Sequence, residues 1–313
     1  MKNNVTHKDI QHKWWVIALS FIIYHLAFSH AVAQEFGMRW LYCAEAEPTQ
    51  QVWFKRNIHT GNYAKTATLS IASEGRCIVY INGYNVSADL FSSNPRGAIG
   101  IHDYDVARFL NEGNNSIAVW YSPTSGSQRQ LYATLHGEWL NGGSFHISND
   151  KGWICRPANA NTLPDGREEI DGQRYMSDWK EYDWKDETNM FSEWKPAQAA
   201  TNLEPAVITF CRHDAPGYRM LRVLKQAKVS QQERALIYDF GQPVEGWVRI
   251  TMRGMKKGEV IEVNGLRYTC KGGSDDQACR RFTTASAGTA RIILPAGRSR
   301  INITRVEAIS VGW

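Results

Sequence analysis

The chain has 313 residues and a formal net charge of +5. Its lysines and arginines are scattered rather than gathered into basic runs, which excludes the charge pattern of a nucleic-acid-binding protein. The length accommodates two domains of ordinary size. Twelve tryptophans and thirteen tyrosines are a heavy aromatic content, which suits both sugar stacking and core packing.

The first 33 residues have the pattern of a signal peptide. Three lysines precede an apolar run at 14–28, and Ala31 and Ala33 provide the small residues at which signal peptidase cleaves. We expect the mature chain, 34–313, to carry a net charge of +3, because residues 1–33 contain three lysines and one aspartate. The apolar run is shorter than the ~20 residues that span a bilayer. We therefore expect no stable membrane span after cleavage, with an uncleaved anchor as the alternative.

The first half of the mature chain is predicted to be built from strands, because apolar and polar residues alternate between clusters of Gly, Asn, Pro and Ser. The predicted strands are 52–58, 66–72, 76–82, 116–121, 131–135 and 144–148. We expect the second and third of these to pair, with Glu74 and Gly75 turning between them. Residues 104–110 are predicted to form a short irregular crossing.

A polar segment, 156–195, follows and is predicted to be an extended aromatic loop. Beyond it, alternation predicts strands at 206–210, 235–239, 246–252, 260–263, 290–294 and 301–311. The sequence therefore predicts an all-β chain with two antiparallel β-sandwich domains of jelly-roll or galactose-binding type. We expect the domains to cover 34–198 and 199–313, the first including the aromatic loop.

Seven short motifs occur in the order found in one family of glycosidases. They are Val52-Trp53-Phe54-Lys55-Arg56, Tyr80-Ile81-Asn82-Gly83, Asp103-Tyr104-Asp105-Val106, Ser148-Asn149-Asp150-Lys151-Gly152-Trp153, Gly172-Gln173-Arg174-Tyr175, Trp194-Lys195-Pro196-Ala197, and Tyr238-Asp239-Phe240-Gly241-Gln242 followed by Gly246-Trp247. Together they resemble the N-terminal β-sandwich and the concanavalin-like domain of bacterial α-L-rhamnosidases. The resemblance implies a carbohydrate-related function.

The chain also departs from that family. Gln173, Met176 and Asp178 stand where the family signature has Glu, Asp and Arg, and Pro243 replaces an asparagine. In the family, catalysis belongs to a helical toroid of several hundred residues that follows the second sandwich. The resemblance therefore implies no catalytic residue in this chain.

The aromatic loop supplies the candidate sugar contacts. Flat indole and phenol rings stack on the C–H face of a sugar, while charged side chains bind its hydroxyls. The candidates are Trp179, Tyr182, Trp184, Arg174, Asp178 and Asp183. The alternative is that these aromatic side chains anchor the loop to the sandwiches.

Six cysteines allow 15 pairings, and Cys270 and Cys279 are the candidate disulfide because they bracket a short Gly-rich loop. No Cys and His spacing indicates a zinc site, so we expect no metal and no cofactor.

These observations favour an exported, non-catalytic carbohydrate-binding or accessory protein in polysaccharide utilisation, at the periplasm or cell surface of a Gram-negative bacterium. Its expected partner is a glycan, with rhamnose-containing glycans among the candidates, and beyond that a glycosidase or a cell-surface protein complex. One alternative is a compact glycoside hydrolase or lyase with its acids in 165–190, since hydrolysis needs two carboxyl groups. Another is a structural subunit of a cell-surface assembly.

Overall fold

The computed structural model of the chain divides into two units, residues 1–39 and residues 40–313. The structure describes residues 39–87, 89–92, 99–124, 126, 128–149, 151–183, 193–201, 203–204, 206–211 and 217–312. The predicted signal peptide lies outside the described residues. Within the described ranges, no helix has the length and apolarity needed to cross a membrane.

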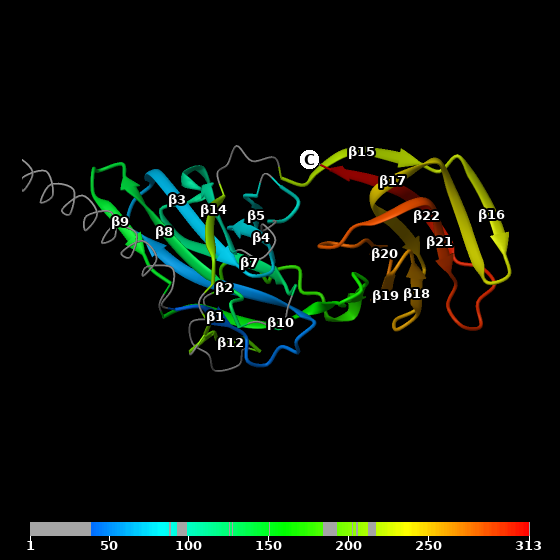
Figure 1. Cartoon of the computed structure of the whole chain (residues 1–313), viewed down its shortest axis with the longest axis horizontal. Coiled ribbons are helices and arrows are strands. Elements are labelled where there is room, and N and C mark those ends of the chain that lie inside the picture. Colours follow the sequence, from blue (N-terminus) through cyan, green and yellow to red (C-terminus); the bar gives the residue numbers. More distant parts are fainter. Residues whose placement is uncertain are drawn as a thin grey trace, which may run out of the picture. The chain divides into compact units, whose positions relative to one another are not determined.

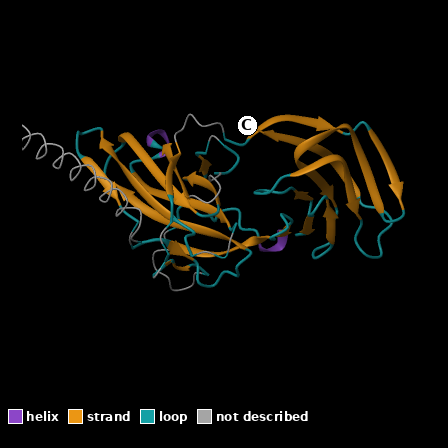
Figure 2. Ribbon diagram, viewed as in Figure 1, coloured by secondary structure: helices purple, strands orange, loops and turns teal. Residues whose placement is uncertain are grey.

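The described chain is made of β-strands joined by turns (Figures 1 and 2). A five-stranded sheet has the order β14 (Ile208–Cys211), β6 (Ile99–Asp105), β3 (Ala64–Ser73), β8 (Tyr132–Trp139) and β9 (Ser144–Ile147). A two-stranded sheet pairs β1 (Leu41–Tyr42) with β13 (Gln198–Ala199). The short 3-10 turns are η1 (Ala107–Phe109) and η2 (Gly172–Arg174).

The largest sheet has 15 strands and runs through both halves of the sequence. Its C-terminal strands, in spatial order, are β15 (Arg219–Lys225), β22 (Asn302–Gly312), β17 (Ala235–Arg253), β21 (Ala285–Ile293), β18 (Val260–Val263) and β19 (Leu266–Thr269). The order continues with β11 (Glu168–Asp171), β10 (Ile154–Thr162), β2 (Gln50–Thr60), β7 (Gly113–Ser122), β4 (Arg76–Ile81) and β5 (Tyr84–Asn85). Three further strands pair beside this path: β12 (Lys195–Pro196) with β10, and β16 (Lys228–Gln232) and β20 (Asp275–Ala278) with β17. The predicted all-β sandwich class is confirmed.

The N-terminal core lies between the five-stranded sheet and strands β2, β4, β7 and β10. Successive side chains of a strand point to opposite faces, so each buried strand serves two environments. On β2, Val52 and Phe54 enter the N-terminal core, whereas Trp53 between them joins a separate aromatic cluster. The run of buried residues in β2 is therefore explained by packing on both faces of the strand.

The predicted pairing of 66–72 with 76–82 is wrong. Strand β3 pairs with β6 and β8, whereas β4 pairs with β5 and β7 in the other sheet. Between them the chain crosses from one layer of the sandwich to the other. The Ser73 hydroxyl donates to the Gly75 carbonyl at 2.9 Å, which fixes the crossing locally. A short turn between two alternating strands does not by itself distinguish a hairpin from such a crossing.

The segment predicted as an aromatic loop contains most of β10 and all of β11, which form an antiparallel hairpin. Strand β11 then pairs in parallel with β19, and β14 pairs in parallel with β6 of the five-stranded sheet. Strand β14 therefore does not join the C-terminal strands, where the sequence placed it. The pairing of β11 with β19 and that of β14 with β6 each join strands from the two predicted domains. The predicted domain boundary between residues 198 and 199 therefore stays a prediction.

The C-terminal core is organised by β17, the 19-residue strand that pairs with β16, β20, β21 and β22. Its register with β21 shifts between Asp239 and Val244, where the pairing is interrupted. Beyond the shift, Gly246 lies so close to β22 that a Cβ there would overlap the carbonyl oxygen of Ile309. The close approach explains the glycine of the Gly246-Trp247 motif in terms of backbone packing.

A third hydrophobic cluster, the aromatic cluster, contains buried rings from both halves of the sequence. Among the described residues, its tryptophans are Trp53, Trp120, Trp179, Trp194 and Trp247, and Phe91 and Phe282 pack with them. The Trp53 ring meets Trp120 edge-on with centroids 5.8 Å apart, and Trp120 meets Phe282 edge-on at 6.0 Å. The cluster accounts for much of the tryptophan content without any ligand.

We expect Gly246→Ala to lower the free energy of unfolding by about 1–3 kcal/mol, because the new methyl group forces β17 away from β22. Urea denaturation measures the change. Gly61→Ala is the control, since a Cβ at Gly61 meets no atom within 4 Å. Equal stability of the two variants would contradict the close approach.

Candidate functional site

The structure places Trp179, the first predicted sugar contact, in the aromatic cluster. Its side chain is 1% exposed. It stacks on Trp53 with centroids 5.2 Å apart and an interplanar angle of 9°, and it contacts Tyr80 and Trp120 edge-on. In this structure the ring presents no free face to a sugar. The alternative weighed from the sequence, an anchoring role, fits its position.

The other predicted contacts lie along the segment that Trp179 anchors. Arg174 and Asp178 are exposed, Tyr182 and Asp183 are half-buried, and Trp184 lies outside the described residues. Main-chain carbonyls tie this segment to the N-terminal strands. The Lys55 ammonium donates to the Glu181 carbonyl at 3.1 Å, and the Asn57 amide donates to the Asp183 carbonyl at 3.0 Å. The two cavities described below are lined by other segments, so these residues remain candidates that border neither cavity.

The predicted disulfide is not formed, because Cys270 and Cys279 are both free thiols. They face different surroundings: Cys270 is buried in the C-terminal core, whereas Cys279 packs against the aromatic cluster. Burial raises the pKa of Cys270 to about 12 and that of Cys279 to about 11, which keeps both thiols protonated and unreactive.

A cavity of about 290 Å³, here named the sheet pocket, opens beside β11, β18, β19 and β21. Strand pairing places three charged residues in one row across it. Glu169 of β11 lies opposite Arg267 of β19, and Arg267 lies opposite Glu262 of β18. Ile293 of β21 continues the row beyond Glu262. Cross-strand neighbours share one face of a sheet, so an acidic, a basic and an acidic side chain border the pocket in sequence.

The three charged side chains of this row remain available to a ligand. Among the residues that the structure describes, neither Glu169, Glu262 nor Arg267 has an oppositely charged partner within 4.0 Å. Leu163, Ile293, Arg291 and Arg167 also line the pocket, and Arg167 is paired with Asp165. The arrangement therefore offers hydrogen-bond donors, hydrogen-bond acceptors and apolar contacts in one open site, which is a general feature of small-molecule sites.

The pocket depends on the hairpin between β18 and β19. Asn264 has a φ of 43° and Gly265 a φ of 77°, the positive angles of the tight turn for which Asn-Gly is favoured. The Asn264 amide donates to the Thr289 carbonyl at 2.7 Å and accepts from the Arg291 amide at 3.0 Å. One side chain thereby fixes the turn against β21.

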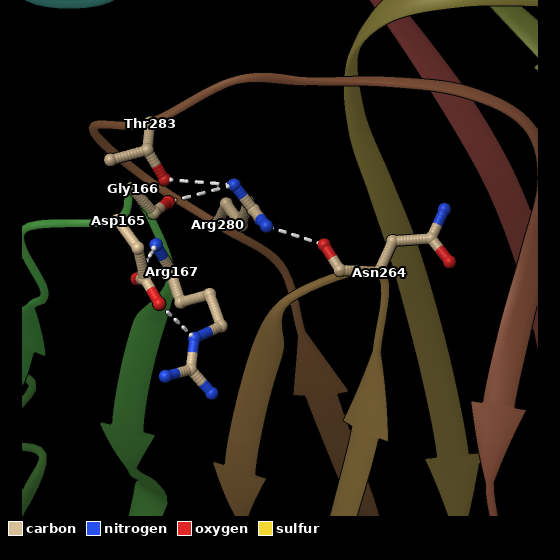
Figure 3. Close-up of polar contacts among 6 residues, drawn as sticks. All are labelled: Asp165, Gly166, Arg167, Asn264, Arg280 and Thr283. Carbon is tan, nitrogen blue, oxygen red and sulfur yellow. Dashed lines mark hydrogen bonds and ion pairs between the residues drawn. The ribbon is translucent and has the colours of Figure 1, made fainter.

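The buried Arg280 joins this hairpin to the β10–β11 turn (Figure 3). Its guanidinium donates to the Gly166 carbonyl at 3.0 Å, to the Thr283 hydroxyl at 3.1 Å and to the Asn264 carbonyl. Burial lowers the pKa of Arg280, and the charges of Glu168 and Asp165 act in the opposite direction. Asp165 is itself bound by Arg167 at 2.6 Å on the outer side of the turn.

Glu168 also lines the pocket, and its carboxylate holds a neighbouring loop. Its carboxylate is fully buried and accepts from the backbone N–H groups of Arg281, Phe282 and Thr283 and from the Thr283 hydroxyl, at distances of 2.7–3.3 Å. All of these donors belong to the loop between β20 and β21. Glu168 is therefore engaged in positioning that loop, whereas its neighbour Glu169 faces the pocket.

Glu168 and Glu169 fall within 165–190, where the sequence placed the acids of the hydrolase alternative, but sequence reasoning missed Glu262 and Arg267. The signal was present in Asn264-Gly265, because a two-residue hairpin turn between alternating strands places Glu262 and Arg267 opposite one another. In the described part of the chain, no group of three or more His, Cys, Asp or Glu residues is arranged to hold a metal ion.

The fold matches solved α-L-rhamnosidases. The enzyme from Dictyoglumus thermophilum superposes with a TM-score of 0.71 and 19% identity, over 87% of this chain and 34% of that protein. The enzyme from Aspergillus terreus superposes with a TM-score of 0.67 and 20% identity, over 85% of this chain and 35% of that protein. The Streptomyces avermitilis enzyme, solved with L-rhamnose, superposes with a TM-score of 0.69 and 18% identity, over 84% of this chain and 28% of that protein.

This chain has a rhamnosidase-like fold. It spans about a third of the length of the rhamnosidases it matches. No family model matches the chain, and no curated protein matches it. The rhamnosidase resemblance read from the motifs is confirmed at the level of the fold.

We expect Trp179→Ala to lower the free energy of unfolding by about 3–5 kcal/mol, the usual cost of truncating a buried tryptophan. Chemical denaturation followed by circular dichroism measures it. Asp178→Ala, an exposed neighbour, is expected to stay within about 0.5 kcal/mol of the parent. A Trp179 variant as stable as the parent would contradict the buried position of this ring and would support a role in sugar contact instead.

Glu168→Ala is expected to cost roughly 3–5 kcal/mol of stability, because four donors lose a buried charged acceptor. Glu168→Gln should cost less, since one oxygen remains. The matched control is Glu169→Gln, which changes the adjacent residue on the pocket side and should cost under about 0.5 kcal/mol. Equal losses at the two positions, measured by urea denaturation, would refute the assigned roles.

Proposed function

We propose that the protein is an exported, non-catalytic carbohydrate-binding accessory of a polysaccharide-degrading system, and that the sheet pocket binds a sugar. The observation that carries the proposal is the charged row of Glu169, Arg267 and Glu262, which borders an open cavity and forms no ion pair with the described residues. The fold shared with α-L-rhamnosidases supports the same class of ligand. Residues 1–33 support export.

The charged row suits a polyhydroxylated ligand. Carboxylate oxygens accept hydrogen bonds from sugar hydroxyls, and a guanidinium donates several hydrogen bonds from one plane. The apolar side chains of Leu163 and Ile293 border the same space and can contact the C–H groups of a sugar ring. Because the pocket is open, little of the ligand is buried and we expect modest affinity.

A specific observation also favours a second candidate function, an assembly subunit. Strand β15 is the last strand of the large sheet in the described order, and its Met220, Leu221 and Val223 side chains are exposed. An edge strand with exposed apolar residues can pair with an extended segment of another protein. The partner in this case would be a glycosidase or a cell-surface protein.

We expect Arg267→Ala and Glu262→Ala each to weaken binding to the best glycan ligand at least about tenfold, because each removes charged hydrogen bonds to the sugar. A glycan array identifies the ligand, and calorimetry measures the change. Arg253→Ala is the matched control, since Arg253 is an exposed arginine of β17 paired with Asp275 away from the pocket.

The bound glycan should remain intact after prolonged incubation. Released product would favour the glycoside hydrolase or lyase alternative over the accessory protein. Binding that survives both pocket substitutions would remove the sheet pocket from the proposal. A protein that binds no glycan would leave the assembly subunit as the better function.

A further inference from the structure

A second cavity, here named the Arg76 cavity, has a volume of about 310 Å³ and a lining of unusual composition. Its lining includes one cationic side chain, Arg76, and hydroxyl-bearing side chains from several segments. The hydroxyls are those of Thr49, Ser122, Thr124, Thr162 and Thr283. No aspartate or glutamate is among the described residues that line it. The composition favours an anionic ligand that also carries hydroxyl groups.

The position of Arg76 is fixed by its neighbours. It begins β4 opposite Ser122 of β7, and its guanidinium lies 5.1 Å from the centre of the Phe91 ring. One guanidinium nitrogen donates to the Phe282 carbonyl. These contacts use one face and one N–H group, so most of the five donors of the guanidinium remain for another acceptor.

The charge of Arg76 has no ionic partner within reach. In the described chain, no carboxylate lies within 4.0 Å of it. Tyr218 and, less strongly, Glu168 act on its charge, but the Glu168 carboxylate already accepts hydrogen bonds from the β20–β21 loop. Burial lowers the pKa of Arg76, so the protein bears a cost for keeping this cation in place. A bound anion would offset that cost.

We propose that the Arg76 cavity binds the carboxylate of a uronic acid residue within a glycan. A planar carboxylate matches two parallel N–H groups of a guanidinium. Ser122, Thr124, Thr162 and Thr283 already form hydrogen bonds within the protein, so their hydroxyl oxygens serve the sugar as acceptors through their remaining lone pairs. Leu163 lines both this cavity and the sheet pocket, so the two cavities are neighbours on either side of the β10–β11 turn. The inference rests on the proposed function and narrows its ligand to acidic glycans.

The test compares tri-uronates, which are trisaccharides of uronic acid residues, with their methyl esters. The esters keep the sugar skeleton and remove the charge of the carboxylates. Calorimetry with the full chain should show that the acid binds at least tenfold more tightly than the ester. Arg76→Gln should abolish this preference, and Arg76→Lys should retain part of it. Circular dichroism of each variant confirms that the fold is kept.

A steric variant tests the cavity without touching Arg76. A Cβ at Gly126, which lines the cavity, meets no atom within 4 Å, so Gly126→Trp places a large ring at the cavity without a clash in the backbone. It should weaken tri-uronate binding at least tenfold. Gly61→Trp is the matched control, because Gly61 has equally open space and does not line the cavity.

Each other outcome overturns a defined statement. Equal binding of acid and ester would overturn the uronate inference and leave the proposed function standing. A preference for the acid that survives Arg76→Gln and Gly126→Trp would overturn this location. Sulfate that displaces the uronate at lower concentration than acetate does would overturn the assignment of a carboxylate. Failure to bind any glycan would overturn the inference together with the proposed function.

Discussion

The arrangement of both cavities depends on one buried carboxylate. Glu168 stands at the start of β11, and the loop that follows β20 is folded around it through three backbone N–H groups and one hydroxyl. A buried charge without such donors would be costly, so the loop and the carboxylate stabilise each other only when both are in place. The same strand pairs with β19, which brings residues about a hundred positions apart into one sheet.

The loop held by Glu168 uses nearly every residue for a different contact. Arg280 holds the β10–β11 turn and the β18–β19 hairpin, and Arg281 lies over Trp120 with 4.6 Å to the ring centre. Phe282 enters the aromatic cluster, and the Thr283 carbonyl accepts from the Trp247 indole at 2.6 Å. The sheet pocket and the Arg76 cavity are therefore built on the same support, and their spacing follows from it.

The sequence predicted the fold class and most strands, because alternation of apolar and polar residues is a local property. It did not predict which strands pair, and the assumed hairpin at Glu74 and Gly75 shows why. Layer changes and hairpins use the same turn residues, and only long-range packing distinguishes them. Trp179 illustrates the corresponding limit for sites, since a tryptophan in a polar segment looks exposed until the rings that cover it are known. The Asn264-Gly265 turn was enough to predict that Glu262 lies opposite Arg267. Their alignment with Glu169 could not be predicted, because it depends on the long-range parallel pairing of β11 and β19.

The parallel stacking of Trp53 and Trp179 has an optical consequence. Two indoles 5.2 Å apart at an interplanar angle of 9° have transition dipoles close enough to couple, and Trp120 lies edge-on to both. A paired positive and negative band in the ultraviolet arises when coupled chromophores are inclined to one another, and the Trp120 ring is inclined by 75° to Trp53 and by 80° to Trp179. Trp53 comes from β2 and Trp179 from the segment after η2, so the band pair reports whether that segment is docked. The near-ultraviolet circular dichroism of these tryptophans thus reports the docking of the segment that follows η2 onto β2.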